Sequence, residues 1–510
     1  MLTLLRNGRI YSPWAPGASA LLVDGDRVRW LGDEATASTL TADRTVQLAG
    51  ALVTPAFVDA HFHATGTGLS LSGLELAGCA TLAEALDAVR EYATQARGRP
   101  VLGSGWDETN WPERRPPTAA ELDRAGYGGV VYLARTDAHS AVASSALMAA
   151  VPELAGLDGY HPSGHLTKQA HHAVRQLALS SISPSHRTEL HRLALRRAAA
   201  LGVVAVHEMA GPEISSAEDL AALLAQARED PELPEVYGYW GELRGAAAAR
   251  ELGAIGAGGD LFCDGSIGSH TAGMHQAYLD ADTSGYLRFD TGELAEHIVQ
   301  CTEGGLQAGF HAIGDAATDQ VVTAMQLAAD RLGDRVAAAR HRIEHAELLT
   351  DVPALARTGL TASVQPAFDA TWGGSDGMYA QRLGAERAGR LNPLAALAAA
   401  GTPLALGSDS PVTPIDPWGA VRAAVHPHSR QHALTVRAAL AAHCHGGWRA
   451  AWADADGSGM LAPGTPASYA IFETTVGADE LPDLAPGRPL PRCLRTVLRG
   501  RQLYDTGELE

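Results

Sequence analysis

The middle of the chain alternates short apolar runs with segments of helical character. Eight runs of strand length end in polar residues, and they read FVDAHFH, GVVAVHEMA, PEVYGYW, GDLFCDG, LQAGFHAIGD, RHRIEHAE, TASVQPAF and TPLALGSDSP. Several are separated by alanine- and leucine-rich segments with the helical period, such as AEDLAALLAQARED and DQVVTAMQLAADRLGD. Eight buried strands that alternate with helices predict an α/β fold built as a (β/α)8 TIM-like barrel.

Both ends of the chain show another pattern, in which short alternating runs are broken by turns. Asn7-Gly8 and Asp24-Gly25 mark reversals near the start, and GTPASYAIFETT and RTVLRGRQLYDTG near the end again have the pattern of short strands. Two β-rich ends on either side of a barrel indicate that the termini pair with each other. We therefore expect residues 1–55 and 463–510 to form one small domain and residues 56–462 to form the barrel.

One connection between predicted strands is much longer than the helical connections of the rest of the barrel. An insertion at about residues 66–200 separates the first predicted strand from the second. It contains the segments VLGSGWDETNWPERRPPTAAELD and VVYLARTDAHSAVASSALM. Long excursions of this kind are often active-site lids, so we expect the insertion to cover the top of the barrel.

Composition and charge narrow the class of protein. Of the 510 residues, 46% are hydrophobic and 19% are charged, which is ordinary for a globular enzyme with a large core. The net charge of −19 repels polyanions, so we expect no nucleic-acid partner. The five cysteines are scattered and form no C-x-x-C pair, which indicates neither a disulfide framework nor a zinc knuckle.

The start of the chain and its longest apolar runs bear on location. Charged residues appear already at Arg6 and Arg9, which leaves too short an apolar stretch for a signal-peptide core. No run approaches the ~18 apolar residues that a membrane span requires. We expect a cytoplasmic protein with no membrane partner.

The strongest candidate chemistry lies in the D-A-H-F-H segment of the first predicted strand. Because side chains alternate along a strand, His61 and His63 share one face and can bind the same cation. By itself an H-x-H pair is weak evidence. Four further predicted strands, however, end in groups suited to metal binding or proton transfer, namely Asp260 with Asp264, His311, His345 and Asp409. Barrel active sites are assembled from the C-terminal ends of strands, so these groups are expected to converge on one metal pocket.

Six segments, in this order, resemble a known family: TPAFVDAHFH, GWDETNW, LFCDGSIGSHTAG, FHAIGDAATD, HRIEHAELL and LGSDSPVTPIDPW. They are similar to the amidohydrolase superfamily, in its amidohydrolase 3 branch of YtcJ-like hydrolases and N-substituted formamide deformylases. The resemblance implies that one or two divalent metal ions, with zinc the first expectation, are bound by His61, His63, His311, His345 and Asp409. It also implies that the two chain ends form a β-sandwich.

One position departs from the pattern of that family. Many relatives carry a carboxylated lysine that bridges two metals, and this chain has Asp260 at the corresponding place. Asp260 is already anionic but shorter, so it would ligate a metal directly, bridge through water, or leave a single metal bound. Alternation along a strand places Asp260 and Asp264 on one face and Cys263 on the other, so we expect Cys263 to be structural.

Further residues are candidates for contact with the substrate. His139, in RTDAHSAVAS, falls where relatives carry a D-x-H motif of the insertion, and it is either a substrate ligand or a packing residue of the lid. Trp106 either lines the pocket or packs the insertion. His207 and Asp264 end predicted strands, and His270 lies in a loop after the fourth strand, where the alternative is a solvated histidine.

These observations predict hydrolysis of a non-peptide C–N bond in a small amide, N-formyl compound or cyclic amide. The reaction would use a metal-activated water with Asp409 as general acid and base. The same groups would also suit deamination of an aminated heterocycle or metal-assisted decarboxylation, and a non-catalytic metal-binding scaffold is the remaining alternative. The expected partner is a small-molecule substrate, and a homodimer is the default oligomeric state.

Overall fold

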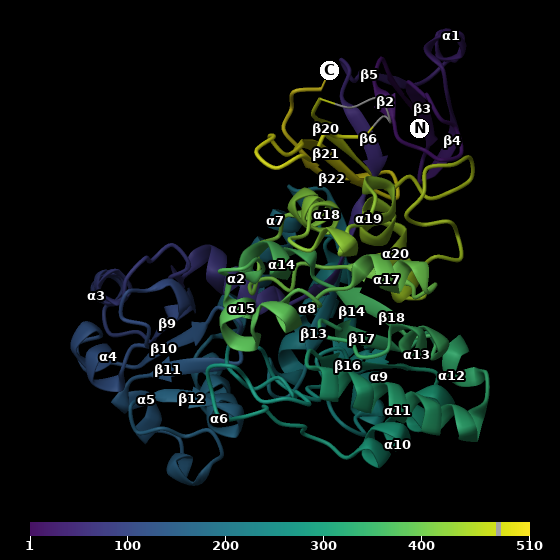
Figure 1. The fold of residues 1–510 in the computed structure, drawn as a ribbon. Coiled ribbons are helices and arrows are strands. Elements are labelled where there is room, and N and C mark those ends of the chain that lie inside the picture. Colours follow the sequence, from purple (N-terminus) through teal and green to yellow (C-terminus); the bar gives the residue numbers. More distant parts are fainter. Residues whose placement is uncertain (476–480, 510) are drawn as a thin grey trace.

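A parallel barrel forms the centre of the computed structural model, which describes residues 1–475 and 481–509 (Figure 1). Eight strands pair in the order β19-β18-β17-β16-β15-β14-β13-β7. Their bounds are β7 Phe57–Phe62, β13 Val203–Ala210, β14 Glu235–Trp240, β15 Gly256–Ala257, β16 Gln307–Ala312, β17 Arg342–His345, β18 Thr361–Val364 and β19 Leu404–Leu406. The first and last strands meet where Phe62 bridges Ser410 and the Asp409 N–H donates to the His61 carbonyl at 2.8 Å. The predicted TIM-like barrel is confirmed.

Amphipathic helices cover the outside of the barrel. The main ones are α7 Pro184–Ala199, α8 Ala217–Glu229, α9 Ala246–Leu252, α10 Thr291–Gly304, α11 Asp315–Leu332, α13 Val352–Arg357, α17 Leu394–Ala399, α18 Pro417–Val425, α19 Val436–His443 and α20 His445–Ala450. In α11 the buried residues include Ala317, Val321, Ala324 and Ala328, which recur every three or four positions. This spacing gives the helix one apolar stripe, which faces the strands.

The fourth strand is shorter and lies earlier than the predicted segment GDLFCDG. β15 covers only Gly256–Ala257, and beyond it a single bridge joins Phe262 to His311. Gly258 and Gly259 interrupt the strand because both have positive φ, at 148° and 78°. A Cβ at Gly258 would lie 2.1 Å from the Gly309 nitrogen, so only glycine allows this close approach. Asp260 therefore leads an irregular segment, and the alternation expected for Asp260 and Asp264 does not apply there.

Both chain ends build two facing sheets above the barrel (Figure 1). One sheet has the order β4-β3-β1-β5, and the other has the order β2-β6-β20-β21-β22. The bounds are β1 Leu2–Arg6, β2 Arg9–Ile10, β3 Ala20–Asp24, β4 Arg27–Gly32, β5 Arg44–Gln47, β6 Leu52–Pro55, β20 Tyr469–Glu473, β21 Arg492–Leu498 and β22 Arg501–Asp505. One apolar core joins residues from both ends, such as Leu21, Val53 and Ile471. The sandwich formed by both termini is thus confirmed as part of the fold, while the exact domain limits stay a prediction.

The insertion folds as a separate layer beside the barrel (Figure 1). Its five-stranded sheet has the order β12-β11-β10-β9-β8, with bounds β8 Leu74–Glu75, β9 Val101–Trp106, β10 Val131–Arg135, β11 Ser140–Ala143 and β12 His165–Thr167. Its helices are α3 Leu82–Ala96, α4 Ala119–Ala125, α5 Ser145–Ala149 and α6 Lys168–Ser180. Asp137 connects the insertion to the barrel because it accepts hydrogen bonds from Ser266 and Ser269, each at 2.8 Å.

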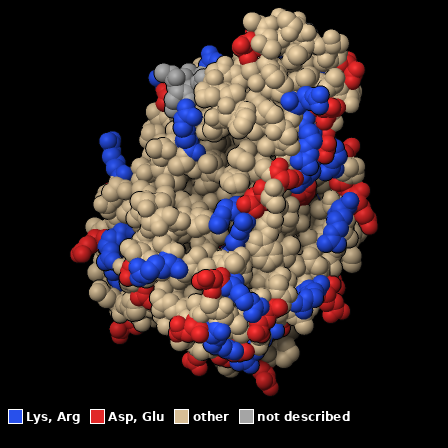
Figure 2. All heavy atoms as spheres, turned by 90° about the vertical axis from the view of Figure 1, so that its right-hand side faces the viewer, with Lys and Arg blue, Asp and Glu red and all other residues tan. Residues whose placement is uncertain are grey.

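Charged side chains of both signs are interspersed on the face shown in Figure 2, which has no continuous basic patch. Among the described residues, no helix has both the length and the apolar composition needed to cross a bilayer.

Candidate active site

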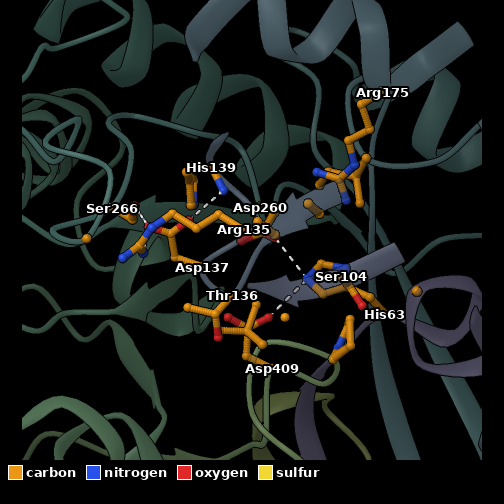
Figure 3. A pocket seen from close by; sticks show the side chains of 18 of the residues that line it. His63, Ser104, Arg135, Thr136, Asp137, His139, Arg175, Asp260, Ser266 and Asp409 are labelled. Atoms are coloured by element: carbon orange, nitrogen blue, oxygen red, sulfur yellow. Dashed lines mark hydrogen bonds and ion pairs between the residues drawn. The ribbon is translucent and has the colours of Figure 1, made fainter. Parts of the chain in front are cut away.

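Six acidic and imidazole side chains meet at the C-terminal end of the barrel. They are supplied by strand ends far apart in the sequence: His61 and His63 by β7, Asp260 by the segment after β15, His311 by β16, His345 by β17 and Asp409 by the turn after β19. Five of the six are buried, and His63 is 12% exposed at its side chain. Several line one pocket, together with residues of the insertion (Figure 3). The convergence is the one expected for a parallel barrel.

Asp260 lies in the middle of this cluster, with its two carboxylate oxygens turned to different histidines. Oδ1 lies 3.4 Å from His61 Nε2, 3.3 Å from His311 Nδ1 and 3.7 Å from His345 Nε2. Oδ2 lies 3.2 Å from His63 Nε2. The short aspartate therefore reaches all four histidines.

Asp409 faces the histidine pair from the turn after β19, the strand that closes the barrel against β7. Its Oδ1 lies 3.1 Å from His63 Nε2 and 3.5 Å from His61 Nε2. The backbone of Asp409 is left-handed, with φ of 54°, and His345 also has a positive φ of 69°. Non-glycine residues adopt this conformation at a cost, and such strain is concentrated at functional sites. His345, at the end of β17, and Asp409, in the turn after β19, thus reach the cluster with backbone conformations that a regular strand does not have.

Outer hydrogen bonds orient three of the histidines. The His61 Nδ1 pairs with Glu344 Oε2 at 2.9 Å, His345 Nδ1 with Gln365 Oε1 at 2.8 Å, and His311 Nε2 with the Gly265 carbonyl at 3.2 Å. An oxygen acceptor on one ring nitrogen holds the proton there and leaves the other nitrogen as a lone-pair donor. In all three rings that other nitrogen is the one that faces Asp260.

Several buried atoms of the cluster have no hydrogen-bond partner within the described part of the chain. They are His61 Nε2, His345 Nε2 and Asp409 Oδ1. Buried polar atoms are rarely left unsatisfied, and imidazole nitrogens together with carboxylate oxygens are the ligands that zinc and similar ions prefer. Three overlapping sets of donors have ligand atoms within 4.8 Å of one another: His61 with His345 and Asp409, His61 with His63 and Asp260, and Asp260 with His311 and His345. The residues present therefore fit a divalent metal.

The charges of the cluster also favour a cation. Burial opposes the charged form of His61, but the Asp260 and Asp409 carboxylates outweigh burial and raise its pKa well above the usual value. Burial would likewise raise the pKa of Asp409, but His61 and His63 outweigh it and lower that pKa. The two carboxylates thus stay ionised and attract positive charge, which a divalent ion would supply.

Sequence comparison decides the family. Residues 44–504 match the model of the amidohydrolase family. The chain belongs to the amidohydrolase family. The chain is 29% identical to the Arabidopsis thaliana protein LONG AFTER FAR-RED 3, with 98% of this chain and 91% of that protein covered. It is 27% identical to the putative amidohydrolase YtcJ of Bacillus subtilis, with 74% of each covered.

A solved structure gives the same assignment. An uncharacterized metal-dependent hydrolase from Pyrococcus furiosus is 29% identical to this amidohydrolase and superposes with a TM-score of 0.71, covering 92% of this chain and 98% of that one. Family, relatives and fold together show a metal-dependent hydrolase acting on carbon–nitrogen bonds.

Of the candidate substrate residues, His139 lies at the metal cluster. It lines the pocket, and its ring centroid is 4.8 Å from that of His311. Burial, followed by the nearby His311 charge, lowers the pKa of His139 to about 3. His139 is therefore a neutral imidazole on the insertion side of the pocket of this amidohydrolase.

The other four candidates are not among the residues that line the pocket, and their contact with substrate stays a prediction. Trp106 is buried in the insertion and donates to the Leu133 carbonyl at 2.9 Å. His207 lies inside the barrel, with its Nδ1 2.7 Å from Arg342 Nη1. Asp264 accepts three backbone N–H groups, from Gly273, Ile313 and Gly314. His270 pairs with Asp280 at 2.9 Å in a partly exposed loop.

Glu208, next to His207, was not among the sequence candidates. β13 keeps a regular register with β14 from Ala205 to Ala210, so strand alternation puts the side chains of His207 and Glu208 on opposite faces of β13. Glu208 lines the pocket instead, and its Oε2 accepts the Ala64 N–H at 2.7 Å. A simple alternation of period two could not have identified it.

Other pocket residues lay outside the sequence candidates. Glu347 accepts a hydrogen bond from the Tyr379 hydroxyl at 2.5 Å, and both line the pocket. Arg175 reaches the same pocket from α6 of the insertion. Glu347 lies within the segment HRIEHAELL, which resembles the family, whereas Tyr379 and Arg175 lie in none of the six segments that carry the resemblance.

Proposed function

We propose that this amidohydrolase cleaves a non-peptide C–N bond of a small amide, N-formyl compound or cyclic amide. The observation that carries the proposal is the position of Asp409, whose Oδ1 lies beside His61 and His63 and has no hydrogen-bond partner among the described residues. A carboxylate held this way can exchange protons with water and with a leaving nitrogen in the same pocket.

The metal would be held by two donor sets that share Asp260. His61 and His63 complete one set, and His311 and His345 complete the other. Asp409 lies close enough to His61 and His345 to contribute as well. When bound, a divalent ion such as zinc lowers the pKa of water toward ~7 and polarises a carbonyl group.

Asp409 would move the proton during the reaction. Its lowered pKa keeps it ionised, so it accepts a proton from the attacking water. The same carboxylic acid then delivers that proton to the nitrogen as the C–N bond breaks. One carboxylate with a free oxygen serves both steps, provided that the water and the leaving nitrogen both lie within hydrogen-bond reach.

His139 and the pocket walls would position the substrate. A neutral imidazole can donate one hydrogen bond to a carbonyl oxygen, and His139 lies beside His311 to do so. The walls are mainly apolar and include Leu69, Ile214, Phe262, Phe368, Trp372 and Met378. The pocket holds about 1370 Å³ of empty space with its mouth included, which suits a small molecule with an apolar body.

A substrate panel tests the proposal. Purified protein loaded with zinc is incubated with N-formyl amines, simple amides, cyclic amides and aminated purines and pyrimidines, and the products are separated by chromatography. We expect an amine and a carboxylate, or a ring-opened acid, from a member of the first three groups. Ammonia from the heterocycles alone would show a deaminase, and carbon dioxide release would show a decarboxylase. Failure of every compound, with metal still bound, would favour a metal-binding scaffold.

A further inference from the structure

Arg175 places a positive charge in the wall of the pocket that faces the metal cluster. It lies on α6 of the insertion, whereas the cluster residues come from the barrel strands. Figure 3 shows its side chain extending from the helix into the space that His63 and Asp260 also face. The proposed hydrolysis gives this residue no role.

The charge of Arg175 is unpaired. It forms no hydrogen bond or ion pair with any residue of the described ranges. The other arginine of the pocket, Arg135, differs because it contacts Asp107, Glu108 and Asp137 at 2.8 to 2.9 Å. The Glu213 carboxylate interacts electrostatically with Arg175, but both of its oxygens already accept hydrogen bonds from Arg288. Arg175 is thus the arginine of the described pocket lining that remains available to a ligand.

The surroundings of Arg175 make an unpaired charge costly in the absence of a ligand. Leu179, Ile214 and Phe262 line the same pocket. Burial lowers the pKa of His172 to about 4, so this neighbour on α6 is neutral and adds no competing cation. A charged group among apolar walls is stabilised mainly by an ion of opposite sign.

A second unpaired group lines the pocket. The Ser215 hydroxyl is buried and has no hydrogen-bond partner within the described residues. It lies two residues beyond Glu213, on the loop that follows β13. A hydroxyl without a partner and a guanidinium without a partner are together suited to one oxyanion, which accepts from both.

We propose that Arg175, with Ser215, binds a carboxylate on the part of the substrate that is not hydrolysed. This inference rests on the proposed function and narrows its substrate to amides that carry an acidic group beside an apolar body. A monoanion fits better than a phosphate dianion because, within the described pocket lining, Arg175 is the one arginine without a partner and no lysine is present, whereas Asp137, Glu208 and Glu347 add acidic groups to the pocket. The planar guanidinium also matches the fork of a carboxylate.

Matched pairs of compounds test the proposal. N-formyl amino acids with increasing chain length, from N-formylglycine to N-formyl-6-aminohexanoate, are compared with uncharged N-formyl alkylamines of equal length. We expect the wild-type enzyme to prefer the acid of the best length by about 10- to 100-fold in kcat/KM, as charge-assisted hydrogen bonds imply. Arg175→Met should erase the preference, mainly through KM, and Arg175→Lys should retain part of it. Arg430→Met, at an exposed arginine away from the pocket, is the control and should change nothing.

Binding measurements separate this inference from the proposed hydrolysis. Calorimetric titration of the same pairs into Asp409→Asn, with and without Arg175→Met, reports affinity without turnover. Acid binding that depends on Arg175 supports the carboxylate site even if no compound is hydrolysed. Equal binding of the acid and its uncharged partner to Asp409→Asn, or a preference for the acid that survives Arg175→Met, overturns the carboxylate site. Amide hydrolysis is tested separately by the substrate panel.

Discussion

Single residues of the site depend on partners that do not contact the substrate, and Glu344 is one such partner. It lies fully buried on β17, accepts from His61 Nδ1, and is itself held by Arg342 Nε at 2.8 Å. Burial would raise the pKa of Glu344, but Arg342 and His61 outweigh burial and lower it to about 2. Glu344 therefore stays ionised and keeps the proton of His61 on Nδ1, which leaves Nε2 for a metal.

Glu344→Gln should weaken metal binding because the amide holds His61 less firmly. Loss of an outer partner of a ligand histidine typically costs about 10- to 100-fold in metal affinity, and we expect a loss of that size. Competition with a chromogenic chelator measures it. Glu251→Gln, at an exposed glutamate on α9, is the matched control. An affinity equal to that of the wild type would show that Glu344 has no part in orienting His61.

Asp409→Asn should abolish turnover while the protein still binds metal. The amide cannot accept a proton, and loss of general acid–base catalysis typically costs about 10²- to 10⁴-fold in rate. Steady-state kinetics and metal analysis on the same sample check both parts. Asp376→Asn, at an exposed aspartate outside the pocket, should keep full activity. Turnover of Asp409→Asn at the wild-type rate would remove Asp409 from the mechanism.

At the scale of elements, hydrophobic patterning was enough to predict most of the barrel. The runs that end at His61, His311, His345 and Asp409 are strands or strand ends in the structure. Their ligands could be predicted because the C-terminal ends of parallel strands always meet. The fourth strand was misplaced because Gly258 and Gly259 break it, and a periodic pattern does not show such a break.

The structure of the insertion could not be predicted from its sequence, and the reason is a different one. Its sheet and helices pack on cores of their own, and residues 159–191 contribute β12, α6 and part of α7. Arg175, which the insertion supplies to the pocket, lies on α6, and the position of this helix depends on tertiary packing. Only His139 carried a motif that pointed to the site.

Arg135 connects the elements of the insertion with the barrel. It is buried and contacts three acidic residues, of which Asp137 also accepts from the loop after β15. Arg135→Met should destabilise the protein by about 3–5 kcal/mol because it takes the compensating charge from the buried Asp137 and from the half-buried Asp107 and Glu108. Urea unfolding followed by circular dichroism measures the change. Arg90→Met removes an exposed ion pair with Asp87 and should cost less than about 1 kcal/mol. Equal effects of the two variants would contradict this account.

At the scale of the whole molecule, one metal centre joins strand ends from β7 to β19 and so connects the beginning of the barrel to its end. A ligand that binds only the folded state stabilises it in proportion to the logarithm of its concentration over Kd. Chelation should therefore lower the melting temperature, and added zinc should restore it. At a metal concentration of 1,000 times Kd the contribution would be about 4 kcal/mol. A melting temperature unaffected by chelator, with metal removal verified, would contradict a bound metal in the folded barrel.

The central claim is that Asp260 joins two sets of histidines into one metal centre. Elemental analysis of purified, zinc-reconstituted protein, wild type beside Asp260→Ala, tests it most directly. Because Asp260 contacts His61, His63 and His311 within 3.4 Å, its loss should affect both sets. We predict two metal equivalents per chain in the wild type and one or none in the variant. Fewer than two equivalents in the wild type, or two in both proteins, would contradict the account.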